Sequence, residues 1–243
     1  MQNKMILEIC ASSYQSAINA QNAGADRIEL CSELALGGIT PSYGLIKKVI
    51  ENVTIPVHVL IRPRSGNFTY SEEEFEIMKA DIEMCKSLGC KGIVSGILNK
   101  DKTIDSSRTK ELITLSHPLS FTFHRAFDWV DDSFEALELL MNMGVDRILT
   151  SGKCSTAQQG IELLKELENG AKNKLSILPG GGINSGNVLE FKAAGFKEIH
   201  CSASTIEYID GVGAISMNSV SFFDENIIVH SDFNKIKNIV DLC

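Results

Sequence analysis

The sequence lacks the long apolar runs and the local motifs that identify several large classes of protein. No apolar segment approaches the ~20 residues of a membrane-spanning helix. The G-x-S-x-G motif of serine hydrolases and the H-E-x-x-H motif of zinc peptidases are both absent. The formal net charge is -8, which argues against a surface for nucleic acid or anionic lipid. We therefore expect a protein that binds neither nucleic acid nor membrane.

Cysteine is present, but not in the spacings that indicate a structural metal site or a redox motif. The seven cysteines include no C-x-x-C or C-x-C pair. The first predicted strand, residues 4–10, leaves no room for a signal peptide before it. We therefore expect a cytoplasmic protein whose cysteines are free thiols.

One short unit recurs four times: helical apolar spacing, a glycine, a few polar residues, and an apolar strand whose far end turns polar. It occurs at residues 24–31, 89–96, 144–152 and 195–202. Glycine suits the left-handed backbone position that follows a helix. Helix–glycine–strand units with polar residues at one strand end are typical of α/β barrels that act as enzymes.

Eight predicted strands, each followed by a predicted helix, account for most of the chain. The 243 residues match the length of one (β/α)8 barrel, and no shift in composition marks a domain boundary. We predict a single-domain α/β protein with the TIM-barrel fold; a doubly wound open sheet is the alternative. Residues 204–231 lie outside the repeat and are predicted to be an insertion before the last helix, forming a lid, a hairpin or a subunit contact. The predicted strands are 4–10, 26–31, 56–62, 91–96, 119–125, 145–151, 174–179 and 198–203, and the helices are 13–23, 42–51, 71–88, 106–116, 133–143, 155–168, 185–194 and 232–242.

The carboxyl ends of the barrel strands are where this fold places its reacting groups. Glu8 and Glu29 end adjacent strands, and His124 ends a strand on the opposite side. Two nearby carboxylates drive each other's pKa values apart, which suits acid–base catalysis, with Asp128 orienting His124. The alternative is a structural ion pair of Glu8 or Glu29 with Arg62.

Two thiols accompany these glutamates. Alternation along the strands puts Cys10 on the face of Glu8, and Cys31 on the face of Glu29. Adjacent strands are ~5 Å apart, so the two sulfurs could bind a soft ion such as Cu(I) in two-coordinate fashion. Two packed thiols without a metal are the alternative. A divalent ion would use carboxylates and imidazoles instead: Glu8, Glu29, His124 and His200.

The same ends carry groups suited to an anion. Arg62 and Arg64 flank a proline and could pair with a carboxylate or a phosphate. Glycines before a helix start can offer backbone N–H groups, and the residues in question are Ser151, Gly152, Gly180, Gly181 and Gly182. Rim salt bridges and a tight turn are the alternatives. No lysine lies in the upper half of a strand, so a Schiff-base aldolase is not expected.

Charged residues at the amino ends of the strands are expected to be solvated and to serve stability. They are Lys4, Asp26, Arg27, Lys91, Asp146, Arg147, Lys174 and Lys197.

Several of these segments together resemble one protein family. They are G-A-D-R-I-E-L-C-S, G-G-I-T-P-S, I-R-P-R-S-G-N-F, M-K-A-D-I, T-F-H-R-A-F-D, R-I-L-T-S-G and P-G-G-G-I, spread over residues 4–204. The pattern is similar to the CutC family of copper homeostasis proteins. The resemblance implies a cytoplasmic TIM barrel, usually a homo-oligomer, with Cu(I) as ligand. Cys31 matches the family position, whereas Cys10 is added here from strand geometry.

Two main hypotheses therefore stand side by side. The first is a copper homeostasis protein that binds Cu(I) through Cys31 and Cys10. The second is an enzyme of unassigned reaction that uses acid–base chemistry on a small phosphorylated or carboxylated compound. A barrel that has lost its chemistry and serves as an oligomeric binding partner is a third, which the polar strand ends disfavour.

Overall fold

Local signals in the sequence fix where most helices begin and end. Ser71 accepts a hydrogen bond from the Glu74 backbone while the Glu74 side chain caps Ser71 in return, which forms a complete capping box. Gly24, Gly89 and Gly144 each follow a helix in the left-handed conformation, as the recurring glycine predicts.

The structure is a computed structural model that describes residues 4–210, 213, 215 and 226–243. The barrel strands are β1 (Ile6–Ala11), β2 (Arg27–Leu30), β3 (Val57–Leu60), β4 (Gly92–Ser95), β5 (Ser120–Phe123), β6 (Arg147–Thr150), β7 (Ser176–Pro179) and β8 (Glu198–Cys201). The helices are α1 (Tyr14–Ala23), α2 (Tyr43–Asn52), α3 (Glu72–Leu88), α4 (Ser106–Ser116), α5 (Ser133–Met143), α6 (Ile161–Ala171), α7 (Val188–Ala193) and α8 (Phe233–Val240).

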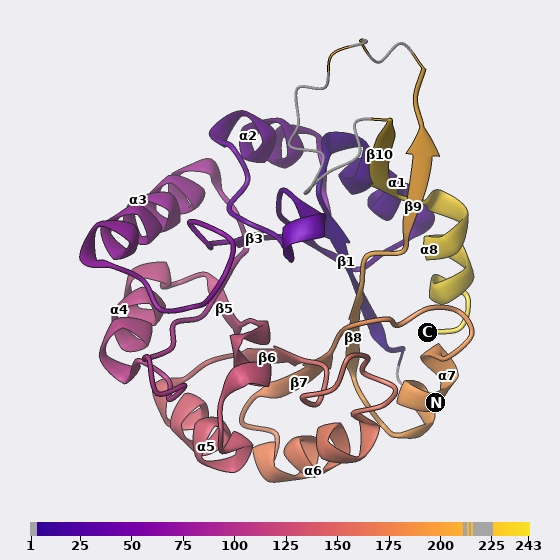
Figure 1. Cartoon of the computed structure of the whole chain (residues 1–243). Coiled ribbons are helices and arrows are strands. Elements are labelled where there is room, and N and C mark those ends of the chain that lie inside the picture. Colours follow the sequence, from indigo (N-terminus) through magenta and orange to yellow (C-terminus); the bar gives the residue numbers. More distant parts are fainter. Residues whose placement is uncertain (1–3, 211–212, 214, 216–225) are drawn as a thin grey trace.

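The eight strands run parallel in the order β7-β6-β5-β4-β3-β2-β1-β8. Gly180, just after β7, forms a parallel bridge with His200 of β8, which brings the two ends of the sheet together. The strands therefore form a nearly closed barrel with the helices around it (Figure 1). The predicted single-domain TIM barrel is confirmed. No helix in the described part of the chain is long and apolar enough to cross a bilayer.

Helix α6 begins at Ile161, whereas the apolar spacing predicted a start near residue 155. Tertiary contacts hold the preceding residues as a loop instead. Asp128 accepts hydrogen bonds from the backbone of Ser151 and Lys153, and the backbone N–H of Ala157 donates to the carbonyl of Gly181. These partners come from other barrel units, so local periodicity could not reveal them.

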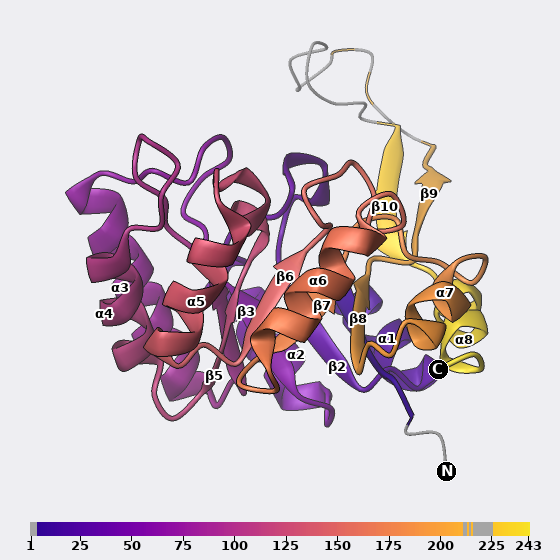
Figure 2. The same ribbon diagram turned by 90° about the horizontal axis from the view of Figure 1, so that it is seen from below.

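Two further strands, β9 (Ser204–Tyr208) and β10 (Ile227–Ser231), pair antiparallel between β8 and α8. They extend beyond the barrel on the side of the loops that follow the strands (Figure 2). The residues that join them, apart from 209, 210, 213, 215 and 226, lie outside the described part of the chain.

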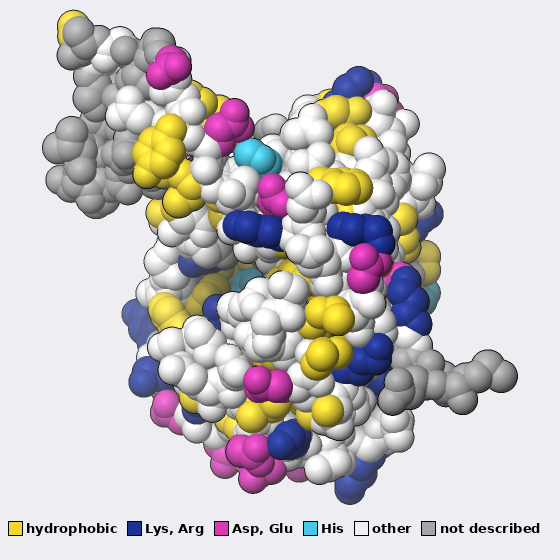
Figure 3. All heavy atoms as spheres, turned by 90° about the vertical axis from the view of Figure 1, so that its right-hand side faces the viewer, with side chains coloured by type: hydrophobic (Ala, Val, Ile, Leu, Met, Phe, Trp, Pro, Cys, Tyr) yellow, Lys and Arg dark blue, Asp and Glu magenta, His cyan; other side chains and the backbone are white. Residues whose placement is uncertain are grey.

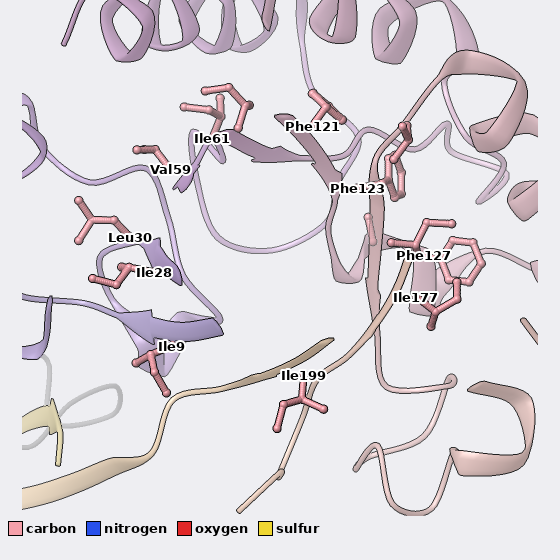
Figure 4. Packing of buried hydrophobic residues seen from close by; sticks show 14 of the residues in the cluster. Ile9, Ile28, Leu30, Val59, Ile61, Phe121, Phe123, Phe127, Ile177 and Ile199 are labelled. Carbon is pink, nitrogen blue, oxygen red and sulfur yellow. The ribbon is translucent and has the colours of Figure 1, made fainter. Parts of the chain in front are cut away.

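Alternate strand residues face two different environments. One set is apolar and packs against the helix layer, including Ile9, Ile28, Val59, Phe121 and Ile199 (Figure 4). The other set faces the barrel interior, and around β1, β2 and β8 this set is charged rather than aliphatic. The residues are Glu8, Arg27, Glu29, Glu198 and His200.

Arg27 is the centre of this charged interior, and the expectation that it is solvated is wrong. Its side chain is 6% exposed and contacts Glu8 through Nε. Its Nη2 lies 2.6 Å from Glu198 Oε2, and Arg147 Nε lies 2.9 Å from the same oxygen. Arginine is buried here because two inward carboxylates from neighbouring strands need a shared cation.

We expect Arg27→Leu to destabilise the barrel by about 3–5 kcal/mol, because Glu8 and Glu198 would lose their common cation while staying buried. Urea unfolding measures this loss. Lys47→Ala is the control, since Lys47 forms an exposed pair with Glu51 at 3.9 Å, worth only about 0.3–0.5 kcal/mol. A similar small loss in both variants would contradict the expectation.

Candidate functional site

A cavity of about 230 Å³ opens at the carboxyl ends of the barrel strands. One wall, from β1, β2 and β8, carries Cys10, Glu29 and His200. A second part of the lining, from the segments after β3 and β5, carries Arg62, His124 and Arg125. We call these the sulfur–acid wall and the basic wall. Phe68, Leu34 and Leu149 add apolar surface, and Gly181, Gly182 and Ile183 complete the lining.

The two thiols contact each other at the sulfur–acid wall, where Cys10 lines the cavity and Cys31 lies behind it. Cys10 aligns with Glu29 across the β1–β2 ladder, and Cys31 follows β2 directly. Cys10 Sγ lies 3.6 Å from Cys31 Sγ and 3.9 Å from Glu29 Oε1, and both thiols are buried. The structure thus brings together the thiols that strand alternation placed on the inward face.

His200 joins these groups from β8. Its Nδ1 lies 2.8 Å from Glu8 Oε1 and 3.9 Å from Glu29 Oε2. Burial by itself would lower the pKa of His200, but Glu29, Cys10 and Glu8 raise this pKa well above its usual value. Burial would raise the pKa of Glu8, but Arg27 and then His200 hold it well below its usual range. Glu8 and His200 therefore form a charged pair.

Ligand atoms of Cys10, Glu29 and His200 all lie within 4.8 Å of one another. A thiol, an imidazole and a carboxylate at this spacing could hold a metal ion. Sulfur and imidazole donors favour soft and borderline ions such as Cu(I) and Zn²⁺ over Mg²⁺ or Ca²⁺.

Glu29 differs from Glu8 although both are buried. Burial, with a smaller contribution from Glu8, raises the pKa of Glu29 to about 7, and His200 and Arg27 only partly oppose this. Its Oε2 has no hydrogen-bond partner among the described residues. Glu29 therefore changes protonation near neutral pH at the wall of the cavity.

Arg62 and Arg64 diverge, although only Pro63 separates them. Arg62 lines the cavity, and the alternative of an ion pair with Glu8 or Glu29 is wrong because Glu8 pairs with Arg27 and His200. Arg64 instead forms an ion pair with Glu74 at the first turn of α3 and does not line the cavity.

His124 lines the cavity, but its expected partner does not reach it. The Nδ1 of His124 accepts a hydrogen bond from the Ala126 backbone at 3.2 Å, and burial, then Arg62, lowers its pKa to about 3. Asp128 was expected to orient His124 and does not. It accepts hydrogen bonds from Thr150 Oγ1 at 2.5 Å and from the Ser151 backbone at 3.1 Å.

Of the three glycines after β7, two line the cavity and one does not. Gly181 and Gly182 line the cavity with φ of +112° and +76°, a backbone region that favours glycine. Gly180 forms the bridge that closes the barrel. Ser151 and Gly152 lie outside the lining, where the Ser151 hydroxyl donates to the Cys154 carbonyl at 2.6 Å.

Two residues near this site lie where the sequence did not predict them. Arg27 was expected at the solvated strand ends, although the alternation Arg27–Glu29–Cys31 is consistent with the inward face. Phe68 is the second. It packs against His124 with ring centroids 4.9 Å apart, and no local pattern in the loop after β3 indicates that contact.

Comparison with known proteins identifies relatives of this chain. The model of the CutC family matches residues 5–205. The human copper homeostasis protein cutC homolog is 48% identical over 202 residues, which cover 83% of this chain and 74% of the human protein. A CutC family protein of Parabacteroides distasonis is 43% identical over 241 residues, 96% of either chain.

Solved structures agree with this assignment. The crystal structure of CutC from Streptococcus agalactiae has a TM-score of 0.77 and 33% identity, and covers 82% of this chain and 98% of its own. An aldolase, QR15, has a TM-score of 0.62 and 13% identity, over 83% and 91% of the two chains. The second likeness shows a shared barrel fold alone.

The raised pKa of Glu29 predicts a pH dependence of stability. The folded protein holds this proton more tightly than the unfolded chain, so its contribution is complete below pH 4.5 and is lost as the pH rises towards about 7. Urea unfolding between pH 4.5 and 8 should show wild type losing stability relative to Glu29→Gln across that interval. If the free energy of unfolding depends on pH in the same way in both proteins, the raised pKa of Glu29 is contradicted.

Proposed function

This chain belongs to the CutC family, and on that premise we propose that it binds monovalent copper through Cys10 and Cys31. One observation carries the proposal: the two buried sulfurs lie 3.6 Å apart, with Cys10 lining the cavity and Cys31 directly behind it. Soft thiolate sulfur is the donor that Cu(I) prefers. The family's human member is named a copper homeostasis protein, which agrees with such a ligand.

The sulfur spacing favours more than two donors. If metal–sulfur bonds are ~2.3 Å long, as for zinc thiolates, sulfurs 3.6 Å apart enclose an angle of about 100° at the metal. A linear two-coordinate ion would need the sulfurs roughly 1 Å further apart. A bent arrangement has room for a further donor, and the neighbours of Cys10 are Glu29 and His200, which can bind the metal once its imidazole has lost a proton.

Protons must leave before copper can bind. The hydrogen bond to Cys31, followed by burial, raises the pKa of Cys10 well above that of a free thiol. The metal must displace this proton, so copper affinity should increase with pH. Glu8 contacts Nδ1 of His200 and so fixes the imidazole ring, as carboxylates commonly do for histidine ligands.

We expect Cys10→Ser and Cys31→Ser each to abolish stoichiometric Cu(I) binding, because each removes one of two adjacent soft donors. Competition with a colorimetric Cu(I) chelator under anaerobic conditions measures the effect. Cys154→Ser is the control, because Cys154 is partly accessible and does not line the cavity.

One outcome would overturn the assignment. Cys85 and Cys90 interact with each other near the end of α3, away from the cavity. Copper binding that survives loss of Cys10 and Cys31 but disappears in Cys85→Ala would move the site to that second pair.

A second candidate function is acid–base catalysis on a small compound in the same cavity. It is favoured by Glu29, whose Oε2 has no hydrogen-bond partner among the described residues although the side chain is buried at the cavity wall. Glu8 is held charged by Arg27, so the two carboxylates have separate roles, as acid–base pairs require. If the free energy of unfolding depends on pH in the same way in wild type and Glu29→Gln, this candidate is ruled out.

We also propose a cytoplasmic homo-oligomer. All seven cysteines are free, which suits a reducing compartment. Strands β9 and β10 expose apolar side chains, with Ile206, Tyr208 and Ile228 at 57%, 77% and 49% exposure. Figure 3 shows apolar atoms on this projection. A second copy of the chain would cover them.

We expect the double variant Ile206→Ser, Tyr208→Ser to form a smaller assembly than wild type, because it removes apolar surface from the projection. Light scattering after size-exclusion chromatography gives the mass. Ile77→Ser is the control, since Ile77 on α3 is 51% exposed at a distance from β9 and β10. A monomeric wild type, or an equal effect of Ile77→Ser, would contradict oligomerisation through these strands.

A further inference from the structure

Arg62 is a buried cation whose partners are all neutral. Its side chain donates to the carbonyl oxygens of Leu36, Gly38 and Gly66 at 2.8–2.9 Å. The residue is 6% exposed, and no carboxylate in the described part of the chain lies within ion-pair distance of it. Carbonyl oxygens position a guanidinium group, but they do not neutralise its charge.

The contrast with Arg27 shows how unusual this is within the same barrel. Arg27 is equally buried and contacts two glutamates, Glu8 and Glu198. A buried charge without a counter-charge is strongly unfavourable, so a protein retains one where a ligand supplies the missing charge. Arg62 lines the cavity, so that ligand has a place to bind.

We propose that the cavity binds a small molecule whose carboxylate or phosphate group pairs with Arg62. One unused polar atom supports this placement. His124 Nε2 is buried and has no hydrogen-bond partner among the described residues, and the His124 side chain lines the cavity. An oxygen atom of an anionic group would satisfy this donor at a site shielded from water.

The rest of the cavity restricts the ligand further. Gly181 and Gly182 line it, and their backbone N–H groups donate to no acceptor in the described residues. These N–H groups can therefore donate hydrogen bonds to a second oxygen of the ligand. Phe68 and Leu149 provide apolar contacts for its carbon skeleton. The volume of about 230 Å³ is below the ~300–1,000 Å³ of drug-sized sites, so the ligand has few heavy atoms.

Arg62 sets its position. The anionic group pairs with the Arg62 guanidinium, which no carboxylate in the described residues neutralises. The rest of the ligand then faces Phe68 and Leu149. This inference goes beyond copper binding and does not depend on it. If the cavity also performs acid–base catalysis, the anion proposal rests on that function and identifies its substrate class.

Isothermal titration calorimetry of the metal-free protein with malonate and with inorganic phosphate tests the proposal. Wild type should bind at least one of these probes saturably, and Arg62→Gln should weaken that affinity at least tenfold. Arg64→Gln is the matched control, because Arg64 pairs with Glu74 outside the cavity. The relative affinity of the two probes distinguishes a carboxylate site from a phosphate site.

Cys31→Ser separates this proposal from copper binding, because Cys31 does not line the cavity: the variant should retain the probe while losing the metal. Absence of saturable binding by wild type, or an equal loss in Arg64→Gln, would overturn the inference.

Arg62 also holds three loop carbonyls, so circular dichroism must show that Arg62→Gln folds. If it does not fold, a crystal of wild type soaked in malonate decides. A carboxylate within hydrogen-bond distance of the Arg62 guanidinium supports the proposal, and malonate bound only elsewhere contradicts it.

Discussion

The Arg27 guanidinium between Glu8 and Glu198 is the interaction on which the interior of this barrel depends. Small barrels usually fill this space with aliphatic layers. Here the cation holds the pKa of Glu8 well below its usual range although the carboxyl group is fully buried, and Glu29, Cys10 and then Glu8 raise the pKa of His200. The geometry of the sulfur–acid wall is therefore set by a residue that does not itself line the cavity.

The cavity separates two kinds of chemistry. Cys10, with Cys31 behind it, meets an imidazole and a carboxylate of raised pKa on the sulfur–acid wall. A guanidinium that no carboxylate in the described residues neutralises, together with the glycine backbone after β7, lines other parts of the same cavity. Soft metal ions favour the first set, and oxyanions favour the second. Copper binding and recognition of a small anion are thus compatible properties of one site, which explains why the sequence supported two hypotheses equally.

Much of this architecture could be predicted from the sequence because the signals are local. Glycine after a helix, caps such as Ser71, and alternation along strands located the units of the barrel and the inward positions of Cys10 and Glu29. The motifs also identified the family. The start of α6 escaped prediction, because contacts of Asp128 and Gly181 from other units hold residues 151–160 as a loop.

The sequence by itself therefore determined the order of elements, the barrel class and the residues available at its carboxyl end. Only the tertiary structure decided how those residues are paired. Arg64 forms an ion pair with Glu74, whereas Arg62 lines the cavity. Asp128 accepts a hydrogen bond from Thr150 and does not contact His124. Arg27 is buried between two glutamates. The physical reason is that pairing and pKa depend on distances between separate strands and on exclusion of water, and neither is encoded in any local stretch of chain.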